Sequence, residues 1–431
     1  MNFLKLAQIC HGKVINPQNF IINHLEINSA KINYGDVFIA IKGKNKDGHD
    51  FIKDAIKKGA KGLITSKKIK THLPYIIVKD TTLALGQIAA YHKNNSKTQV
   101  IAITGSTGKT TTKELIYNLL KTKYKVLKTE GNQNNHLGVP LTLLKIKDED
   151  FAIVEMGMNH SGEISYLSKI AQPSLALITN IGSSHIGNLK SQENILKAKL
   201  EIKDGLKGEL IVSGDDSYLK KVKAIKIGFN PENDFRGYNL KSNFMSTEFN
   251  IKYKKQNKKI KINLPAHLVS DVLLSIYVAI KYNINIETIC QVLKNFHNVN
   301  MRLNMITSAT NTIINDCYNS SFESLTGDLT MLQGIKQKKL LILGDIAEAG
   351  IYSKTIHENL KPFIEKLTNY EAILVGKEML NLQINKAKHF KNYEETIKYL
   401  KTQDIKNTLI LIKASRSMAF ENIANYFLKK F

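Results

Sequence analysis

The segment Gln99–Glu114 carries residue types that bind phosphate groups. It predicts a short apolar strand, a tight loop with Gly105 and Gly108, and a helix that begins at Lys109. Such a loop turns backbone N–H groups inward, and the N-terminus of the helix adds partial positive charge. The glycines allow close backbone approach, Lys109 can reach terminal phosphates, and the Thr110 hydroxyl can hold Mg²⁺. We therefore expect a nucleotide-phosphate site.

The spacing of this loop is unusual. A standard phosphate loop has four residues between its glycines, whereas this loop has Ser106 and Thr107 there and Ile103 where the first glycine would be expected. The alternative is an ordinary strand–turn–helix with a chance Gly-Lys-Thr. Because strand, loop and helix all fall where phosphate binding needs them, we favour a nucleotide-phosphate site. Its expected contacts are Gly105, Ser106, Thr107, Gly108, Lys109, Thr110 and Thr111.

Alternating short strands and helices predict an α/β fold around this loop. Residues 1–95 predict a small N-terminal α/β domain with strands at 36–41, 62–65 and 76–78 and helices at 50–58 and 82–93. The polar run 93–98 is a candidate linker. Residues 96–305 predict a central, doubly wound parallel sheet that contains strands at 151–154, 175–178 and 210–212, an antiparallel segment at 239–264 and a helix at 269–282.

Residues 306–431 predict a third, C-terminal Rossmann-like α/β domain with parallel strands at 312–314, 340–343, 372–375 and 408–412. Three of these strands end in polar segments, at Asp316, Gly344–Glu348 and Lys413–Arg416. Polar strand ends of this kind favour a second binding crevice that faces the first. The expected architecture is α/β with three domains, in which a central P-loop-type ATPase sheet is flanked by the two smaller domains.

Polar residues also follow the strands of the central domain. Glu155 ends one apolar strand, and Thr179 and Asn180 end the next. Because parallel sheets bind ligands at the carboxyl ends of their strands, we expect these residues near the phosphate loop. Glu155 could hold a Mg²⁺ that also touches Thr110. The alternative for Glu155 is a solvated acid at a strand end.

Two other candidate residues are less distinctive. His185 lies in a Gly- and Ser-rich loop just past a predicted strand, where a ligand role and a structural role are equally open. Lys199 lies on a predicted helix, and nothing local separates it from the other lysines.

The formal net charge of +25 raises the hypothesis of nucleic-acid binding. The basic residues are spread along the chain, however, and only Arg236, Arg302 and Arg416 are arginines. A dedicated nucleic-acid binder would use more Arg for forked contacts, so lysines on solvated faces explain the charge better. In such a chain a remaining Arg can mark a site that needs a planar guanidinium.

The sequence has no apolar run of 18 residues, so we expect no membrane insertion. It also lacks a basic N-terminal region before an apolar core, so we expect no signal peptide. Its three cysteines favour a reducing, cytoplasmic location over disulfides or a zinc site. We also expect a monomer.

Taken together, the motifs resemble those of the Mur ligases of peptidoglycan synthesis, which are related to folylpolyglutamate synthetase. Thr104–Thr111 is similar to their shortened phosphate loop, and Gly43–Phe51 is similar to their N-terminal substrate segment. Gly131–Leu144 is close to the version in the members that add D-alanyl-D-alanine. The same holds for three C-terminal segments: Asp316–Asn319, Leu343–Glu348 with His357, and Lys413–Met418.

This resemblance implies a reaction and its cofactors. ATP would phosphorylate the tripeptide carboxylate of a UDP-N-acetylmuramoyl-tripeptide, and the amine of D-alanyl-D-alanine would displace phosphate from the acyl phosphate. Lys109 would steady the β- and γ-phosphates, and Thr110 and Glu155 would hold a first Mg²⁺. His185 would bind a second Mg²⁺, and Lys199 would be carbamylated to a bridging, carboxylate-like ligand.

The resemblance also implies nucleotide contacts for Arg302 and Asp316. The scarcity of arginine points independently to Arg302 and Arg416 as functional positions. Lys413, Ser415 and Arg416 would lie near the phosphate and the incoming amine. The remaining expected substrate contacts are Ser29, Lys31, Asp47, His49, Asn135 and Asn319. Arg236 has no expected role.

Three positions depart from the family pattern. Ser29-Ala30-Lys31 stands where relatives carry Ser-Arg, and His136 replaces an acid. The family's His-Asn-x-x-Asn is matched to Ser270–Leu274, which lacks the asparagines. These departures concern the uridine and adenine contacts more than the family resemblance.

The alternatives are a related ligase that adds diaminopimelate, Lys or glutamate, a basic ATPase that binds nucleic acid, and a non-catalytic scaffold. Retention of Lys109, Glu155, His185 and Lys199 argues against the scaffold. Whether the third peptide residue is diaminopimelate or Lys stays open.

Overall fold

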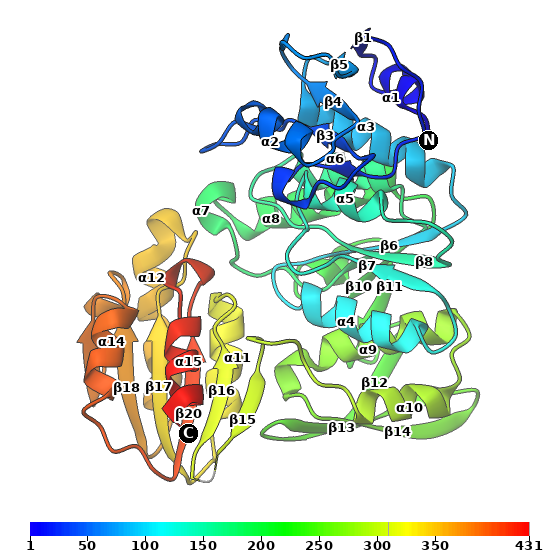
Figure 1. Ribbon diagram of the computed structural model, residues 1–431. Coiled ribbons are helices and arrows are strands. Elements are labelled where there is room, and N and C mark those ends of the chain that lie inside the picture. Colours follow the sequence, from blue (N-terminus) through cyan, green and yellow to red (C-terminus); the bar gives the residue numbers. More distant parts are fainter. Residues whose placement is uncertain (309, 431) are drawn as a thin grey trace.

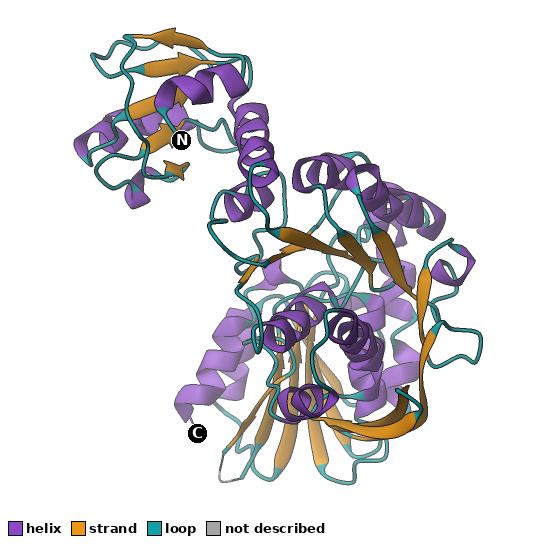
Figure 2. Cartoon of the chain, turned by 90° about the vertical axis from the view of Figure 1, so that its right-hand side faces the viewer, coloured by secondary structure: helices purple, strands orange, loops and turns teal. Residues whose placement is uncertain are grey.

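The computed structural model describes residues 1–308 and 310–430 and has three α/β lobes, each built on its own sheet (Figure 1). The first sheet lies within residues 13–77, the second within 99–262 and the third within 304–413. The N-terminal lobe projects from the other two (Figure 2). Among the described residues, no helix combines the length and the apolar character needed to cross a bilayer.

The N-terminal sheet has the strand order β1-β5-β4-β3-β2, with β1 antiparallel to β5 and the other pairs parallel. Its elements are α1 (Phe3–Ile9), β1 (Lys13–Ile15), β2 (Leu25–Glu26), β3 (Val37–Ile39), α2 (Ile52–Lys57), β4 (Gly62–Thr65), β5 (Tyr75–Ile77) and α3 (Thr81–Asn94). The helix α3 begins where the Asp80 carboxylate accepts hydrogen bonds from the backbone N–H groups of Thr82 and Leu83. Leu85 on α3 belongs to the N-terminal core, whereas Ala89 belongs to the central one.

The central sheet has nine strands in the order β14-β13-β12-β11-β10-β9-β6-β8-β7. Its strands are β6 (Gln99–Thr104), β7 (Val126–Lys128), β8 (Phe151–Glu155), β9 (Leu175–Ile178), β10 (Glu209–Ser213), β11 (Ile225–Gly228), β12 (Phe235–Asn243), β13 (Ser246–Tyr253) and β14 (Gln256–Ile262). All neighbours from β7 to β12 are parallel, and β12, β13 and β14 form the antiparallel extension expected at 239–264.

Helices cover both faces of the central sheet, as expected for a doubly wound fold (Figure 1). One face packs against α4 (Lys109–Leu120), α9 (Val269–Lys281) and α10 (Ile286–Lys294). The other packs against α5 (Gly138–Leu143), α6 (Glu163–Ala171) and α8 (Gln192–Leu200). The strands β6, β8 and β9 are buried on both faces, which explains their continuous apolar runs.

The third sheet has the order β15-β16-β20-β17-β18-β19, with β15 antiparallel and the rest parallel. Its strands are β15 (Asn304–Thr307), β16 (Thr312–Asp316), β17 (Lys338–Gly344), β18 (Tyr370–Val375), β19 (Ala387–Phe390) and β20 (Thr408–Lys413). Its helices are α11 (Phe322–Met331), α12 (Ser353–Glu358), α13 (Lys361–Glu365), α14 (Tyr393–Leu400) and α15 (Glu421–Lys430).

Some predicted bounds differ from the structure. The helix expected at 50–58 is a 3₁₀ turn over Gly48–Phe51 followed by α2. The polar run 93–98 is partly helical, because α3 continues through Asn94. The third sheet begins at Asn304, two residues before the predicted domain boundary.

Candidate active site

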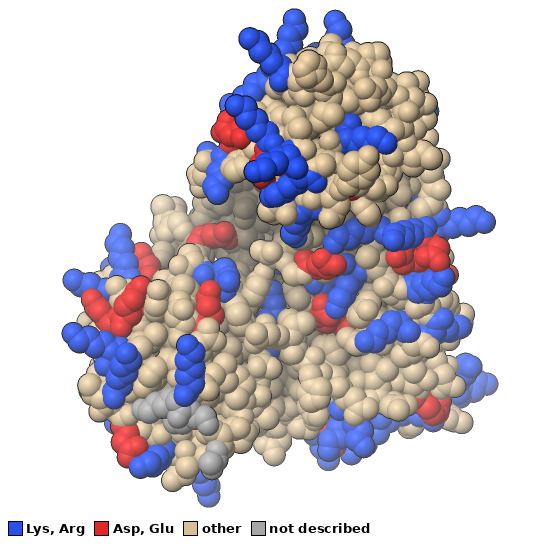
Figure 3. Space-filling model, viewed as in Figure 1, with Lys and Arg blue, Asp and Glu red and all other residues tan. Residues whose placement is uncertain are grey.

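A cavity of about 1180 Å³ lies between the central and third domains. Its walls are the loop after β6, the ends of β8 and β9, the start of α9 and the strand ends of the third domain. The space-filling view shows a hollow between the lobes, with Lys and Arg scattered over the whole face (Figure 3). The cavity therefore brings together the two crevices that the sequence predicts.

The phosphate loop leads into a helix whose N-terminus has no side-chain cap. Gly108, with φ +78°, is the N-cap of α4, and no side chain caps the helix, so its first N–H groups can bind an anion. Thr107 N donates to Asn180 Oδ1 at 2.9 Å, which ties the loop to the end of β9. A Cβ on Gly108 would lie 2.3 Å from Asp271 Oδ2 of α9, so the loop needs glycine here.

Lys109 folds back over this loop. Its Nζ donates to the carbonyl oxygen of Gly105 at 2.6 Å. Burial lowers the pKa of Lys109, and the Glu155 carboxylate opposes that shift. The ammonium of Lys109 therefore lies directly beside the phosphate loop.

Glu155, at the end of β8, meets the predicted magnesium ligand Thr110. Thr110 Oγ1 donates to Glu155 Oε2 at 3.0 Å, and Asn134 Nδ2 donates to Oε1 at 2.9 Å. Lys113 Nζ lies 3.7 Å from Oε2. A carboxylate and a hydroxyl at hydrogen-bond distance are hard oxygen donors of the kind that Mg²⁺ takes.

Lys199 on α8 is 1% exposed. No hydrogen bond or ion pair to its ammonium occurs in the part of the chain that the structure describes. Burial, together with the neighbouring Lys109, lowers the pKa of Lys199 well below its ordinary value. A buried, unpaired ammonium is unfavourable, so this environment favours the neutral amine.

His185 precedes α7 (Ile186–Leu189) and reaches the third domain. Its Nδ1 lies 2.5 Å from Glu348 Oε2, and both residues line the cavity. The predicted ligand His185 is therefore held from across the domain boundary by a residue that was not expected to contact it.

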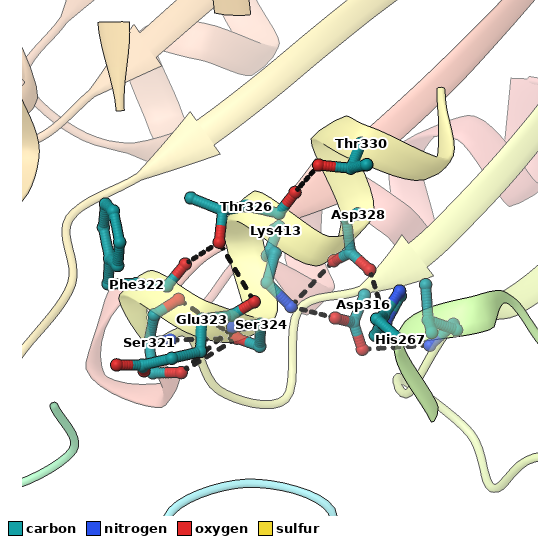
Figure 4. A network of polar contacts seen from close by, with 11 residues as sticks. His267, Asp316, Ser321, Phe322, Glu323, Ser324, Thr326, Asp328, Thr330 and Lys413 are labelled. Carbon is teal, nitrogen blue, oxygen red and sulfur yellow. Dashed lines mark hydrogen bonds and ion pairs between the residues drawn. The ribbon is translucent and has the colours of Figure 1, made fainter. Parts of the chain in front are cut away.

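A buried ion cluster stands at the third-domain wall (Figure 4). The Lys413 ammonium contacts Asp316 Oδ2 and lies 2.9 Å from Asp328 Oδ2. Asp316 Oδ1 accepts from Leu303 N in the interdomain segment at 2.9 Å. His267 Nε2, from the central domain, lies 3.4 Å from Asp328 Oδ1.

Burial and charge set the protonation of this cluster. Burial raises the pKa of Asp328 well above its ordinary value. Burial also opposes ionisation of Asp316, but Lys413 outweighs it and lowers the pKa of that carboxyl. For Lys413 the two carboxylates outweigh burial and raise its pKa. Burial lowers the pKa of His267 to about 4, so its ring is neutral at physiological pH.

Two of the three arginines lie at this cavity. The Arg302 guanidinium carbon is 4.2 Å from the Tyr318 ring centroid, and that of Arg416 is 6.0 Å from it. Arg416 Nη1 also lies 3.0 Å from Glu421 Oε1. Arg236 is exposed on β12, away from the cavity lining.

The N-terminal candidates form a separate group. Asp47 Oδ1 lies 2.5 Å from His49 Nδ1, and His49 Nε2 accepts from Ser66 N at 3.0 Å. The backbone and ring N–H groups of His49 hold the pKa of Asp47 well below its usual range. Ser29 is buried in a short 3₁₀ helix, and Lys31 is exposed at its end.

Comparison with known proteins decides the family. Residues 21–93 match the model of the "Mur ligase family, catalytic domain", and residues 103–279 match that of the "Mur ligase middle domain". The UDP-N-acetylmuramoyl-tripeptide–D-alanyl-D-alanine ligase of Bacillus subtilis is 33% identical over 97% of this chain and 96% of its own. The chain belongs to the Mur ligase family.

Solved structures agree with this assignment. MurF from Acinetobacter baumannii is 29% identical, with a TM-score of 0.90 over 99% of this chain and 98% of its own. MurF ligase from Thermotoga maritima, described in complex with ADP, is 29% identical, with a TM-score of 0.85 over 95% of this chain and 97% of its own. This Mur ligase thus has the three-domain α/β fold that the sequence predicts.

Most of the expected site residues of this Mur ligase share the cavity. They are Ser106, Thr107, Gly108, Lys109, Thr110, Thr111, Asn135, Glu155, His185, Arg302, Asp316, Asn319, Lys413, Ser415 and Arg416. Ser29, Lys31, Asp47 and His49 lie in the N-terminal domain, and Gly105 and Lys199 are not among the residues that line the cavity.

Several residues that line the cavity were not predicted from the sequence. His267 and Asp271 both line the cavity and are four apart. Their spacing equals that of the His and the second Asn in His-Asn-x-x-Asn, a pattern that the sequence analysis matches instead to Ser270–Leu274. Spacing alone could have found this pair. Asn134, Tyr318 and Glu348 lie within motifs already noted, whereas no local signal marks Asp328.

Proposed function

We infer that this Mur ligase joins D-alanyl-D-alanine to the tripeptide carboxylate of UDP-N-acetylmuramoyl-tripeptide in peptidoglycan precursor synthesis, with ATP as the energy source. Full-length similarity to ligases of that activity carries the inference. ATP phosphorylates the carboxylate, and the dipeptide amine then attacks the acyl phosphate. A tetrahedral intermediate forms, phosphate leaves and an amide remains.

The physical task is to bring two anions together. The carboxylate and the γ-phosphate repel each other, so positioned cations and N–H groups must offset that repulsion. Lys109 beside the loop and the uncapped start of α4 support the phosphate loop as the place where the nucleotide phosphates bind. The third-domain strand ends face them across one cavity, which supports transfer between ligands held by the two domains.

We propose that Mg²⁺ is held by Thr110, Glu155, His185 and a carbamylated Lys199. The adjacent Thr110 and Glu155 oxygens support the first part of this set. The unpaired, buried Lys199 supports the second, because a neutral amine reacts with CO₂ and the resulting carbamate is an anionic oxygen donor. When bound, Mg²⁺ would neutralise the phosphate charge.

Further contacts follow from position. We propose that Arg302 and Asp316 contact the nucleotide, and that Asn135, Asn319 and Arg416 contact the two peptide substrates in the cavity. Lys413 and Ser415 are each 1% exposed and already bonded, so they act by holding the cavity wall.

We propose that the N-terminal group binds the UDP end of the larger substrate. Its members are Ser29, Lys31, Asp47 and His49. We also propose that the protein acts as a monomer in the cytoplasm, where its three free cysteines stay reduced.

The test is a coupled phosphate-release assay with purified protein. Release should require ATP, a UDP-muramoyl-tripeptide and D-alanyl-D-alanine together. Tripeptides ending in diaminopimelate and in Lys are compared in parallel, which also identifies the acceptor. Equal release without the dipeptide, or release with folate and glutamate instead, would refute the proposal.

A further inference from the structure

Glu348 has no part in the function proposed above, yet its backbone is unusual. It closes the polar segment Gly344–Glu348 after β17 and has φ +62°. His185, which it contacts, has φ +65°. Both are residues with a Cβ in the left-handed region, which persists only where surrounding contacts impose it. Two such residues therefore face each other across the domain boundary.

The backbones beside them approach closely. Gly187 N donates to the Glu348 carbonyl oxygen at 3.0 Å. A Cβ on Gly187 would lie 2.7 Å from that oxygen, and a Cβ on Gly350 would lie 2.8 Å from Gly187 Cα. Only glycine allows this approach, so the contact between His185 and Glu348 is part of a fitted junction.

The third domain fixes the turn that carries Glu348. Ile346 N donates to His357 Nε2 at 3.0 Å, and Ala347 N donates to Ser415 Oγ at 2.8 Å. His357 Nδ1 lies 2.7 Å from the carbonyl oxygen of Ser353, which sets the tautomer that can accept at Nε2. The motif residues His357 and Ser415 thus hold the segment that aims Glu348.

We propose that Glu348 is a positioning residue for His185: it holds Nδ1 toward the third domain and leaves Nε2 facing the cavity as a cation ligand. The role of Nε2 rests on the proposed function. Among residues 1–308 and 310–430, Glu348 Oε2 is the side-chain acceptor beside Nδ1, at 2.5 Å, and Nε2 has no hydrogen bond to another residue. A carboxylate on one ring nitrogen fixes the tautomer and raises the basicity of the other nitrogen.

The contact crosses the domain boundary. Glu348 therefore orients the His185 ring only while the third domain lies against the central one. The His185 ring also holds the pKa of Glu348 below its usual range, against partial burial. Closure of the third domain therefore completes the imidazole part of the cation site.

The chain supplies a matched control in Glu323, another third-domain acid that reaches the same segment. Its Oε1 accepts from Ser183 N at 2.6 Å, and its Oε2 accepts from Ser183 Oγ at 3.1 Å. Removing Glu323 deletes an interdomain contact of similar kind without touching the imidazole.

The first experiment is ¹⁵N NMR of the histidine side chains in the metal-free, full-length protein, at a pH where the imidazole is neutral. The His185 signal is assigned by comparison with His185→Gln. The wild type, Glu348→Gln and Glu323→Ala should carry the proton on Nδ1. Glu348→Ala should shift the proton toward Nε2, because Ala offers no acceptor. A wild-type ring protonated on Nε2, or an unchanged ring in Glu348→Ala, overturns the proposal.

The second experiment titrates Mn²⁺, detected by electron paramagnetic resonance, into the protein with a non-hydrolysable ATP analogue. Glu348→Ala should weaken Mn²⁺ binding by about 10- to 100-fold, and Glu323→Ala should leave it near the wild-type value. A changed tautomer with unchanged Mn²⁺ affinity overturns the cation role. Absence of Mn²⁺ binding in the wild type counts instead against the proposed ligand set, and the tautomer comparison still decides the role of Glu348.

Discussion

The carboxylate of Asp271 lies against Gly108, the last residue of the phosphate loop, so closely that a Cβ there would come within 2.3 Å of Oδ2. Helix α9 therefore supports the loop with a buried acid. Four residues earlier, His267 contacts the third domain. The start of α9 and the short 3₁₀ turn before it thus touch both sides of the cavity.

The first prediction concerns Asp271→Asn. Burial, opposed by Thr112 and Lys109, raises the pKa of Asp271 to about 7 from 3.8. Between these values the folded protein retains a proton that the unfolded chain releases, so this residue lowers stability as pH rises through that window. The variant has no titrating group at this position and so lacks this loss of stability. Its Tm, measured by differential scanning fluorimetry, should fall less between about pH 5 and pH 8 than that of the wild type; parallel profiles would contradict the assignment.

Lys109→Ala should abolish measurable ligation. The change removes the cation that lies over the loop and leaves the fold intact, because its hydrogen bond to Gly105 is local. Losing one positioned charge at a transferring phosphate lowers turnover by at least about 100- to 1,000-fold. Phosphate release and circular dichroism should be measured together. Turnover within threefold of wild type (roughly what losing a minor contact gives) would show that Lys109 does not reach the phosphates.

Lys199→Ala should also abolish ligation, and short-chain carboxylic acids should restore part of it by replacing the carbamate. A small carboxylate can occupy the space of the lost side chain and supply an oxygen donor. Lys197→Ala is the control, since Lys197 is exposed on the same helix. If the acids do not restore ligation in Lys199→Ala, or if both variants respond to the acids alike, the carbamate is contradicted.

Arg302→Lys should weaken nucleotide binding despite the retained charge. The Arg302 guanidinium stacks on Tyr318, which an ammonium cannot reproduce with the same geometry. We expect at least about a tenfold rise in the KM for ATP, which corresponds to about 1.4 kcal/mol. Arg236→Lys, on exposed β12, should not change it. Equal KM values in both variants would remove Arg302 from the nucleotide site.

Lys413→Met should destabilise the protein by about 3–5 kcal/mol, because it leaves two buried carboxyl groups without their cation. Asp328→Asn should have a much smaller effect, since Asp316 remains to pair Lys413. Chemical denaturation with separate fluorescence and activity readouts would measure both. A larger loss in Asp328→Asn would show that Asp328 is the principal partner of Lys413.

The sequence predicted the parts of the fold and site that have local signals. The buried strands β6, β8 and β9 appear as apolar runs, and the loop between β6 and α4 is continuous in sequence. Polar residues at their ends, such as Glu155, converge as expected because parallel strands end at one edge.

The parts of the site that the sequence did not predict depend on contacts between residues distant in sequence. His185 and Glu348 meet only because a loop after β9 touches a turn after β17. Asp328 lies inside α11, where nothing in the helical pattern distinguishes it from a solvated acid until Lys413 is placed beside it. Short strands such as β2 and β7 carry too few residues for a periodic signal.

The helix α3 also constrains how the molecule moves. Its side chains belong to two hydrophobic cores at once, so swinging the N-terminal lobe would pull apart packed apolar surface on both sides. The third lobe is joined to the central one by hydrogen bonds and ion pairs, together with a few partly buried apolar side chains such as Ile186 and Leu268, and over the described ranges it shares no helix with that lobe. We therefore expect the N-terminal and central domains to move as one rigid unit. The third domain would move relative to them, opening the cavity for substrate entry and product release.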